Sequence, residues 1–243
     1  MRRMVITAFL FLLFLFLSGL THAVQVPASF ENLSVLQVDN TPVGPIRILY
    51  EPKLTQVILK KDEELYEEAG VLEIKAIKTK LAANEKEYYI VEYSQGPSVD
   101  PGFSIYQEGQ DSDKTLFGIA ATTLIIPGNG SIYAAGHTNN MFNERRKFVF
   151  KKGKIVEVSQ PFLYVGLDTK VNKDVTIYST PGPTPVGYDV VAHIPKGSKI
   201  SVLLNKNDYY LLATPFGLVG WTKIGYEPIG YPTTIEGLYD AGD

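Results

Sequence analysis

Residues 199–224 read KISVLLNKNDYYLLATPFGLVGWTKI, and this stretch decides the fold of the C-terminal part of the chain. It contains three short runs rich in large and β-branched side chains, at 199–204, 209–213 and 218–224. The residues between the runs, 205–208 and 214–217, are rich in Asn, Asp, Pro and Gly. Connections this short join only antiparallel neighbours, so the stretch predicts three consecutive antiparallel strands.

Two more strands are predicted just before this stretch, at 174–179 and 190–194. The turn Pro195-Lys196-Gly197 leads from the second of them into residue 199 and is short enough only for antiparallel neighbours, so 190–194 and 199–204 are expected to pair. The residues between the two, 180–189, form a long loop that three prolines stiffen. Five short antiparallel strands with one long loop predict a small barrel.

The closing part of this segment carries a family signature. Residues 217–222 read GLVGWT, similar to the last strand of the bacterial SH3 family (SH3b), with Gly before Trp. The Pro-Lys-Gly turn and the run Tyr209-Tyr210-Leu211-Leu212 also resemble that family. Residues 176–181, TIYSTP, depart from its usual Asn-Val-Arg-Ser-Gly-Pro. The resemblance covers about 174–226 and implies an SH3-like five-stranded barrel with a binding groove.

Aromatic side chains beside the long loop are the predicted ligand contacts. The resemblance implies that the groove lies there and at the 205–208 turn, near Tyr178, Tyr188, Tyr209 and Tyr210. A tyrosine offers a flat apolar face and a hydroxyl, which suits sugar rings or peptide stems. Because side chains alternate along a strand, we expect about half of these rings to point inward. Trp221 is expected to cap the barrel core, and direct contact with the ligand is the alternative.

The preceding residues have the sequence pattern of a second β-rich domain. We expect it to be a meander, or an open barrel or sandwich. Short runs of Val, Ile, Tyr, Phe and Thr alternate with Gly and Pro. Hairpins are indicated at 124–135 and at 148–158, each with Gly in its turn. Other strands are predicted at 35–38, 46–49, 56–59, 72–77, 88–93 and 103–107. Only 60–69 has the composition of a helix. The predicted class is therefore mostly β.

Composition divides the chain into four parts. These are a signal peptide (1–23), a β-rich domain of unknown family (24–170), the SH3-like barrel (171–226) and a C-terminal tail (227–243). The boundary between the domains is placed in the polar, turn-rich stretch 165–172. Because the tail keeps Ile235, Leu238 and Tyr239, we expect it to pack back on the protein, with a solvated tail as the alternative.

The N-terminus has the pattern of a secretory signal. Arg2 and Arg3 precede an apolar run at 5–17, and Thr21-His22-Ala23 offers a cleavage site. The run is shorter than the ~20 residues that a membrane-spanning helix needs. We expect export to the periplasm or the exterior, with no stable membrane anchor after cleavage. An uncleaved anchor is the alternative.

Composition also excludes several classes of function. The chain has no Cys, which excludes disulfides, thiolate metal sites and cysteine nucleophiles. Cleavage after Ala23 removes two of the 23 basic residues, so 21 remain against 26 acidic ones, a formal charge of −5. Nucleic acid is a poor partner for an acidic exported chain. We find no cofactor motif and predict no metal site, since the mature chain holds only His137 and His193.

One segment, 136–146 (GHTNNMFNERR), is the densest polar stretch of the chain. His137 with Glu144 would form an acid–base pair, and Arg145 and Arg146 would hold an anion. The simpler interpretation is a loop whose Thr and Asn side chains bond its own backbone while the arginines are solvated.

These features predict a non-catalytic binding or scaffold protein of the bacterial cell envelope. Its SH3-like domain would bind cell-wall glycan or peptide, or an envelope protein. One alternative is a cell-wall hydrolase that uses His137 and Glu144. The other is a structural or assembly partner that docks another envelope protein and binds no glycan.

Overall fold

The computed structural model describes residues 30–38, 45–61, 73–95, 101–136, 141–182, 189–225 and 232–238. The chain divides into two compact units, 1–32 and 33–243, and every strand described below belongs to the second. The predicted signal peptide, most of the predicted helix, His137 and Tyr188 lie outside the described residues. Regular structure in the described part consists of 17 strands and short 3₁₀ turns such as Pro52–Leu54, which confirms the mostly β class.

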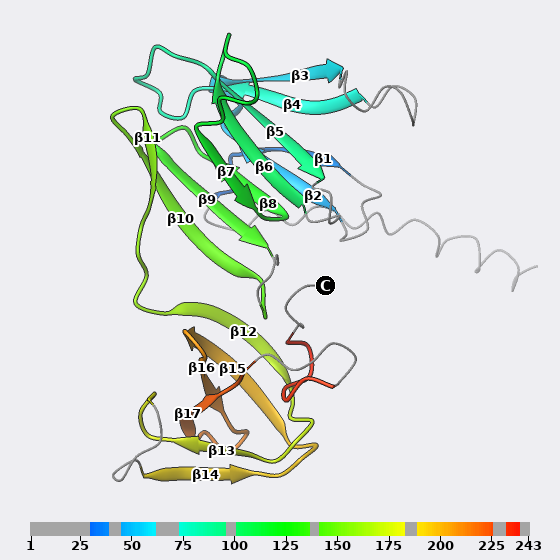
Figure 1. Cartoon of the computed structure of the whole chain (residues 1–243), viewed down its shortest axis with the longest axis vertical. Coiled ribbons are helices and arrows are strands. Elements are labelled where there is room, and N and C mark those ends of the chain that lie inside the picture. The colour runs from blue at the N-terminus through cyan, green and yellow to red at the C-terminus, as the bar shows by residue number, and fades with distance from the viewer. Residues whose placement is uncertain are drawn as a thin grey trace, which may run out of the picture. The chain divides into compact units, whose positions relative to one another are not determined.

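The first sheet has six strands, and Figure 1 labels them all. In spatial order they are β1 (Ser34–Val38), β2 (Ile46–Tyr50), β8 (Thr123–Ile126), β9 (Ser131–Gly136), β10 (Glu144–Lys151) and β11 (Lys154–Glu157). Both predicted hairpins are confirmed, as β8–β9 and β10–β11. The turn of the second has left-handed Lys152 and Gly153, with φ of 53° and 71°, as a two-residue hairpin turn requires.

The second sheet is a five-stranded antiparallel meander. Its strands are β3 (Thr55–Lys61), β4 (Glu73–Thr79), β5 (Tyr89–Gln95), β6 (Pro101–Gln107) and β7 (Phe117–Ala120). The meander lies in sequence between β2 and β8, which are parallel neighbours in the first sheet. Parallel neighbours need a long crossover connection, and here the whole meander serves as that connection.

The two sheets share one hydrophobic core. Ile48 of β2 and Leu124 of β8 are buried together with Ile77, Val91 and Phe103 of the meander. The buried residues alternate with more exposed ones along β6 and β9, as expected where one face of a strand packs on a core. Of the predicted alternatives, the arrangement fits a sandwich.

The third sheet, here called the C-terminal sheet, contains the five strands predicted for the barrel. They are β13 (Val175–Tyr178), β14 (Val190–Ile194), β15 (Lys199–Lys206), β16 (Tyr209–Ala213) and β17 (Val219–Lys223). A sixth strand, β12 (Leu163–Lys170), was not predicted. The expectation of a turn-rich stretch at 165–172 is therefore wrong. β12 lies at the edge of the sheet, and only Val165 among its residues is buried.

The predicted barrel closure is not found among the described residues. The strand order is β12-β15-β16-β17-β13-β14, which leaves β12 and β14 at opposite edges. The expectation that β14 and β15 pair across their short connection is wrong. A strand has two edges, and those of β15 are occupied by β12 and β16. The turn between β14 and β15 bonds instead to Val171, through Gly197 N and Ser198 O.

The tail packs back on the protein in its described part, 232–238, as predicted. Ile235 forms a β-bridge with Val171, and Glu236 N donates to Lys170 O. Ile235 and Leu238 are buried in the core of the C-terminal sheet with Val202 and Leu212. Among the described residues, no helix has the length and apolar character needed to cross a membrane.

Candidate binding face of the C-terminal sheet

The C-terminal sheet has two apolar faces, and only one of them faces the core. Along β16 the even positions Tyr210 and Leu212 are buried, whereas Tyr209, Leu211 and Ala213 are half-buried. β17 alternates in the same way, with Trp221 on the half-buried side. We call the face that carries Leu211 and Trp221 the outer face.

A continuous row of large side chains crosses the outer face. Strand register places six residues side by side: Tyr164 of β12, Leu204 of β15, Leu211 of β16, Trp221 of β17, Tyr178 of β13 and Val190 of β14. None of them is buried, and Tyr164 and Val190 at the two ends are 55% and 49% exposed. At the usual spacing of strands, this outer row spans roughly 24 Å.

Tyr164 is held in place by a bulge in β12. The register of β12 on β15 shifts between Tyr164 and Leu167, and Gly166 in the bulge has a φ of 66°. A side chain at Gly166 would place its Cβ 2.5 Å from the Tyr164 hydroxyl, so only glycine allows the ring to lie there. Arg145 adds a hydrogen bond from Nη1 to Tyr164 O (3.2 Å), and its guanidinium lies 5.0 Å from the ring centroid.

Phe162 lies against the row. Its ring centroid is 5.8 Å from that of Trp221, with the planes inclined by 35°. Lys206 Nζ lies 5.6 Å from the Phe162 centroid. Lys206 pairs with Tyr209, which pairs with Lys223, so polar tips flank the aromatic row.

A recess of about 430 Å³ opens beside Phe162. It is lined by the end of the connection from β11 to β12 and by the β15–β16 turn. Its lining residues are Glu157, Ser159, Gln160, Pro161, Phe162, Leu163, Asn205, Lys206 and Asn207. Most of these side chains are polar, and Phe162 supplies the aromatic wall.

The structure places the predicted ligand contacts on both faces of the C-terminal sheet. Tyr178 and Trp221 lie in the outer row, and Tyr209 lies on the same face. Tyr210 is 3% exposed and packs edge-to-face on Phe142 in the core, so the strand alternation that we expected is present. Tyr188 is outside the described residues. The expectation that Trp221 caps the core is wrong, because its side of β17 faces away from the core cluster.

Sequence reasoning missed Tyr164, Phe162, Leu204 and Leu211 as members of this surface. Tyr164 and Phe162 belong to a stretch expected to end one domain. The aliphatic residues at alternate positions, Leu163, Val165 and Leu167, were the signal that could have indicated a strand.

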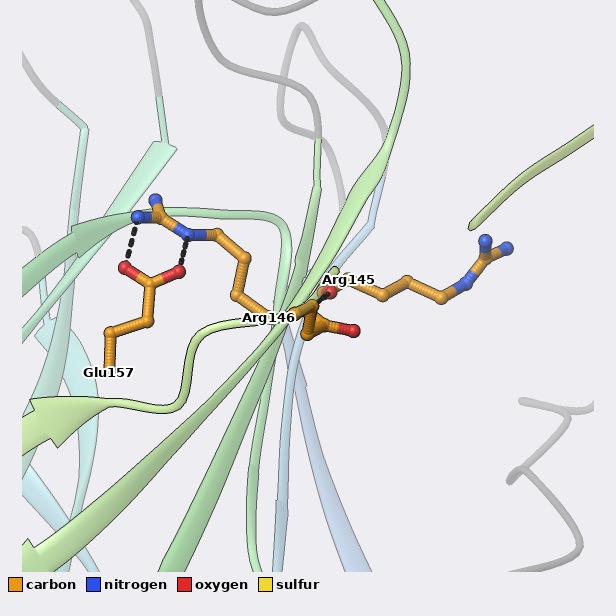
Figure 2. Close-up of polar contacts among 4 residues, drawn as sticks. Arg145, Arg146 and Glu157 are labelled. Carbon is orange, nitrogen blue, oxygen red and sulfur yellow. Dashed lines mark hydrogen bonds and ion pairs between the residues drawn. The ribbon is translucent and has the colours of Figure 1, made fainter. Parts of the chain in front are cut away.

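The candidate catalytic residues on β10 do not converge. Figure 2 shows Arg145 and Arg146 extending in opposite directions from the strand. Arg146 donates from Nε and Nη2 to the two carboxylate oxygens of Glu157, at 3.0 and 2.6 Å. This bidentate bond raises the pKa of Arg146. The two arginines therefore do not form the joint anion site that the sequence indicated.

Glu144 is half-buried and sits opposite Gly136, the residue that directly precedes His137. Burial raises the pKa of the Glu144 carboxyl; the nearby Arg146 guanidinium opposes this effect, and Glu157 adds to it. His137 itself is outside the described residues. His193 is exposed, and its Nδ1 lies 2.9 Å from Thr176 Oγ1. Within the described ranges, no three His, Asp or Glu side chains are grouped as metal ligands.

Comparisons with known protein families, with curated proteins and with solved structures found no match for this chain. The resemblance of 174–226 to bacterial SH3 domains therefore stays a prediction.

Proposed function

We propose that this chain is a non-catalytic binding protein exported to the bacterial cell envelope, and that its outer row holds a cell-wall polymer. One observation carries the proposal: six large side chains from six strands line up on a face that the protein core leaves uncovered. Monomeric proteins rarely expose contiguous apolar surface without a use for it.

The chemistry of the row favours a polymer that has flat apolar faces and many polar groups. Tyr164, Trp221 and Tyr178 offer ring faces, on which the apolar side of a sugar ring stacks. Lys206, Tyr209 and Lys223 flank the row with hydrogen-bonding tips that suit hydroxyl and amide groups. Cell-wall glycan with its peptide stems combines these properties.

Two sequence features support the location and the partner. The pattern of residues 1–23 favours export, and the resemblance of 174–226 to bacterial SH3 domains favours the cell wall. A periplasmic or extracellular protein without Cys is stabilised by its packed cores and not by disulfides, which fits a small stable binding module.

Retention on purified cell walls tests the proposal. The purified protein should co-sediment with walls, and Trp221→Ala and Tyr178→Ala should each weaken retention about tenfold, since each removes one stacking surface. Tyr88→Ala is the matched control, because Tyr88 is an exposed aromatic residue (38%) before β5 in the meander sheet. Absence of retention, or equal loss in all three variants, contradicts the proposal. Capture of an envelope protein without wall binding would favour the assembly-partner alternative.

A hydrolase is the second candidate function, and the raised pKa of Glu144 favours it. A carboxyl with a raised pKa keeps its proton to a higher pH than a free carboxyl does, which is what a general acid requires. Release of soluble wall fragments by the wild type, lost in both Glu144→Gln and His137→Ala with the fold retained, would establish this function. Equal inactivity of the wild type and both variants would remove it.

A further inference from the structure

Asn205 at the end of β15 is a buried polar side chain with half of its hydrogen-bonding capacity unused. It is 5% exposed. Its Nδ2 donates to Asn207 O at 2.6 Å and, more weakly, to Tyr209 O at 3.4 Å. Because both acceptors are carbonyl oxygens, the amide atom that faces them is the nitrogen, and the other amide atom is Oδ1. Within the part of the chain that the structure describes, Oδ1 accepts no hydrogen bond.

A buried acceptor without a donor is costly, so its neighbourhood matters. Asn205 lines the recess beside Phe162. The exposed Glu157 carboxylate, another acceptor of the lining, is already engaged at both oxygens by Arg146. The Ser159, Gln160 and Asn207 side chains of the lining are exposed, whereas Asn205 is the buried one, and its Oδ1 has no donor among the described residues. A ligand in the recess would supply that donor with its own N–H or O–H group.

The remaining walls favour an uncharged ligand with one apolar face. Phe162 is 39% exposed, and its ring is in contact with Trp221 of the outer row. Glu157 and Lys206 contribute one charge of each sign, so the lining does not favour an anion or a cation. A volume of about 430 Å³ is in the range of small-molecule sites.

We propose that this recess is a subsite for one sugar ring of the polymer that the outer row holds. The ring lies with its apolar face toward Phe162 and donates a hydroxyl or acetamido hydrogen to Asn205 Oδ1. This inference rests on the proposed function and extends it, because it assigns a sugar, and not the peptide stem, to the recess. The contact between Phe162 and Trp221 joins the subsite to the row.

Trp221 is the single tryptophan of the chain and lies against Phe162, so its fluorescence reports on the subsite. The probes are a β-1,4-linked hexamer of N-acetylglucosamine, the corresponding glucose hexamer, and the wall peptide stem freed of its sugars. We expect a saturable change with at least one hexamer. Binding of the N-acetylglucosamine hexamer alone identifies the acetamido N–H as the donor, and binding of both hexamers identifies a hydroxyl.

Two variants test the contacts. Asn205→Ala removes the acceptor and should weaken hexamer binding about tenfold. Because it also removes the bonds within the β15–β16 turn, thermal unfolding is measured in parallel. Phe162→Leu leaves that turn untouched and should weaken binding by a similar factor. Tyr88→Ala again serves as the control and should bind as the wild type does.

Failure of this inference and failure of the proposed function give different results. The inference is overturned if neither hexamer binds, if only the peptide stem binds, or if both variants bind the hexamers as the wild type does. Retention on whole walls that still depends on Trp221 and Tyr178 would then leave the proposed function standing. Loss of wall retention itself would overturn the proposed function as well.

Discussion

Glu144 shows how a single side chain couples burial to pH. Its pKa is raised above the ordinary 4.5 mainly because burial disfavours the ionised form. The folded chain therefore binds this proton more readily than the unfolded chain does. Stability contributed by the neutral carboxyl is fully present below the unfolded pKa and is lost as the pH rises through the folded one.

Glu144→Gln should therefore stabilise the protein at pH 7 and have little effect at pH 3.5. Glutamine keeps the size and polarity of the side chain but cannot ionise, so the cost of burying a charge disappears. Urea unfolding of both proteins at the two pH values measures the difference. A variant that is less stable than the wild type at pH 7 would show that the electrostatic attraction between the carboxylate and Arg146 outweighs the cost of its burial.

Strand β9 ends at a glycine because another part of the chain passes too close for a side chain. A Cβ at Gly136 would lie 2.8 Å from Ala121 Cα and closer still to Thr122 N. The two segments are also joined by a hydrogen bond from Thr122 N to Ala135 O, at 3.0 Å. Since the atoms in the way are backbone, they cannot rotate aside.

Gly136→Ala should lower the free energy of unfolding by about 1–3 kcal/mol, the usual cost of overpacking. Gly118→Ala in β7 is the matched control, because its Cβ would meet nothing within 4 Å. The control should be neutral or slightly stabilising, since Ala loses less conformational freedom than Gly. Chemical denaturation of both variants decides the matter, and similar effects of the two substitutions would contradict the close approach.

Local sequence pattern predicts where the strands lie, but it does not predict which strands pair with one another. Alternating apolar residues and the glycine turns located β8, β9, β15, β16 and their hairpins to within a residue or two. β12 was not predicted because Gly166, Asp168 and Lys170 give it the composition of a turn. An edge strand tolerates such residues. Because β12 pairs with one edge of β15, the pairing predicted between β15 and β14 is absent.

For the molecule as a whole, the described tail is part of a core and not an appendage. Ile235 is fully buried. On either side of it, Thr234 O accepts a hydrogen bond from Asn172 N, and Glu236 N donates one to Lys170 O. Residues more than 60 positions apart in the chain are thereby joined at one edge of the C-terminal sheet. A C-terminal fragment that stops before 232 would leave this core open.

Ile235→Ala should therefore destabilise the protein by about 2–5 kcal/mol, as other deletions of buried aliphatic groups do. Glu236→Ala, one residue on, removes only an ion pair with Lys170 whose two side chains are half exposed, and should cost no more than about 1 kcal/mol. Denaturant unfolding of the two variants gives the comparison. If Ile235→Ala costs as little as Glu236→Ala, the tail does not contribute to the core.

The amino-acid order was sufficient for the β class, the places of most strands and turns, and the lack of disulfides, because these depend on neighbours in the chain. It could not tell which side of β16 faces inward. Tyr209 and Leu211 are as apolar as Tyr210 and Leu212, and an alternation of period two is symmetric when both sets are apolar. Packing against Phe142 and the tail buried one set, and this choice left Leu211 and Trp221 on the outer face.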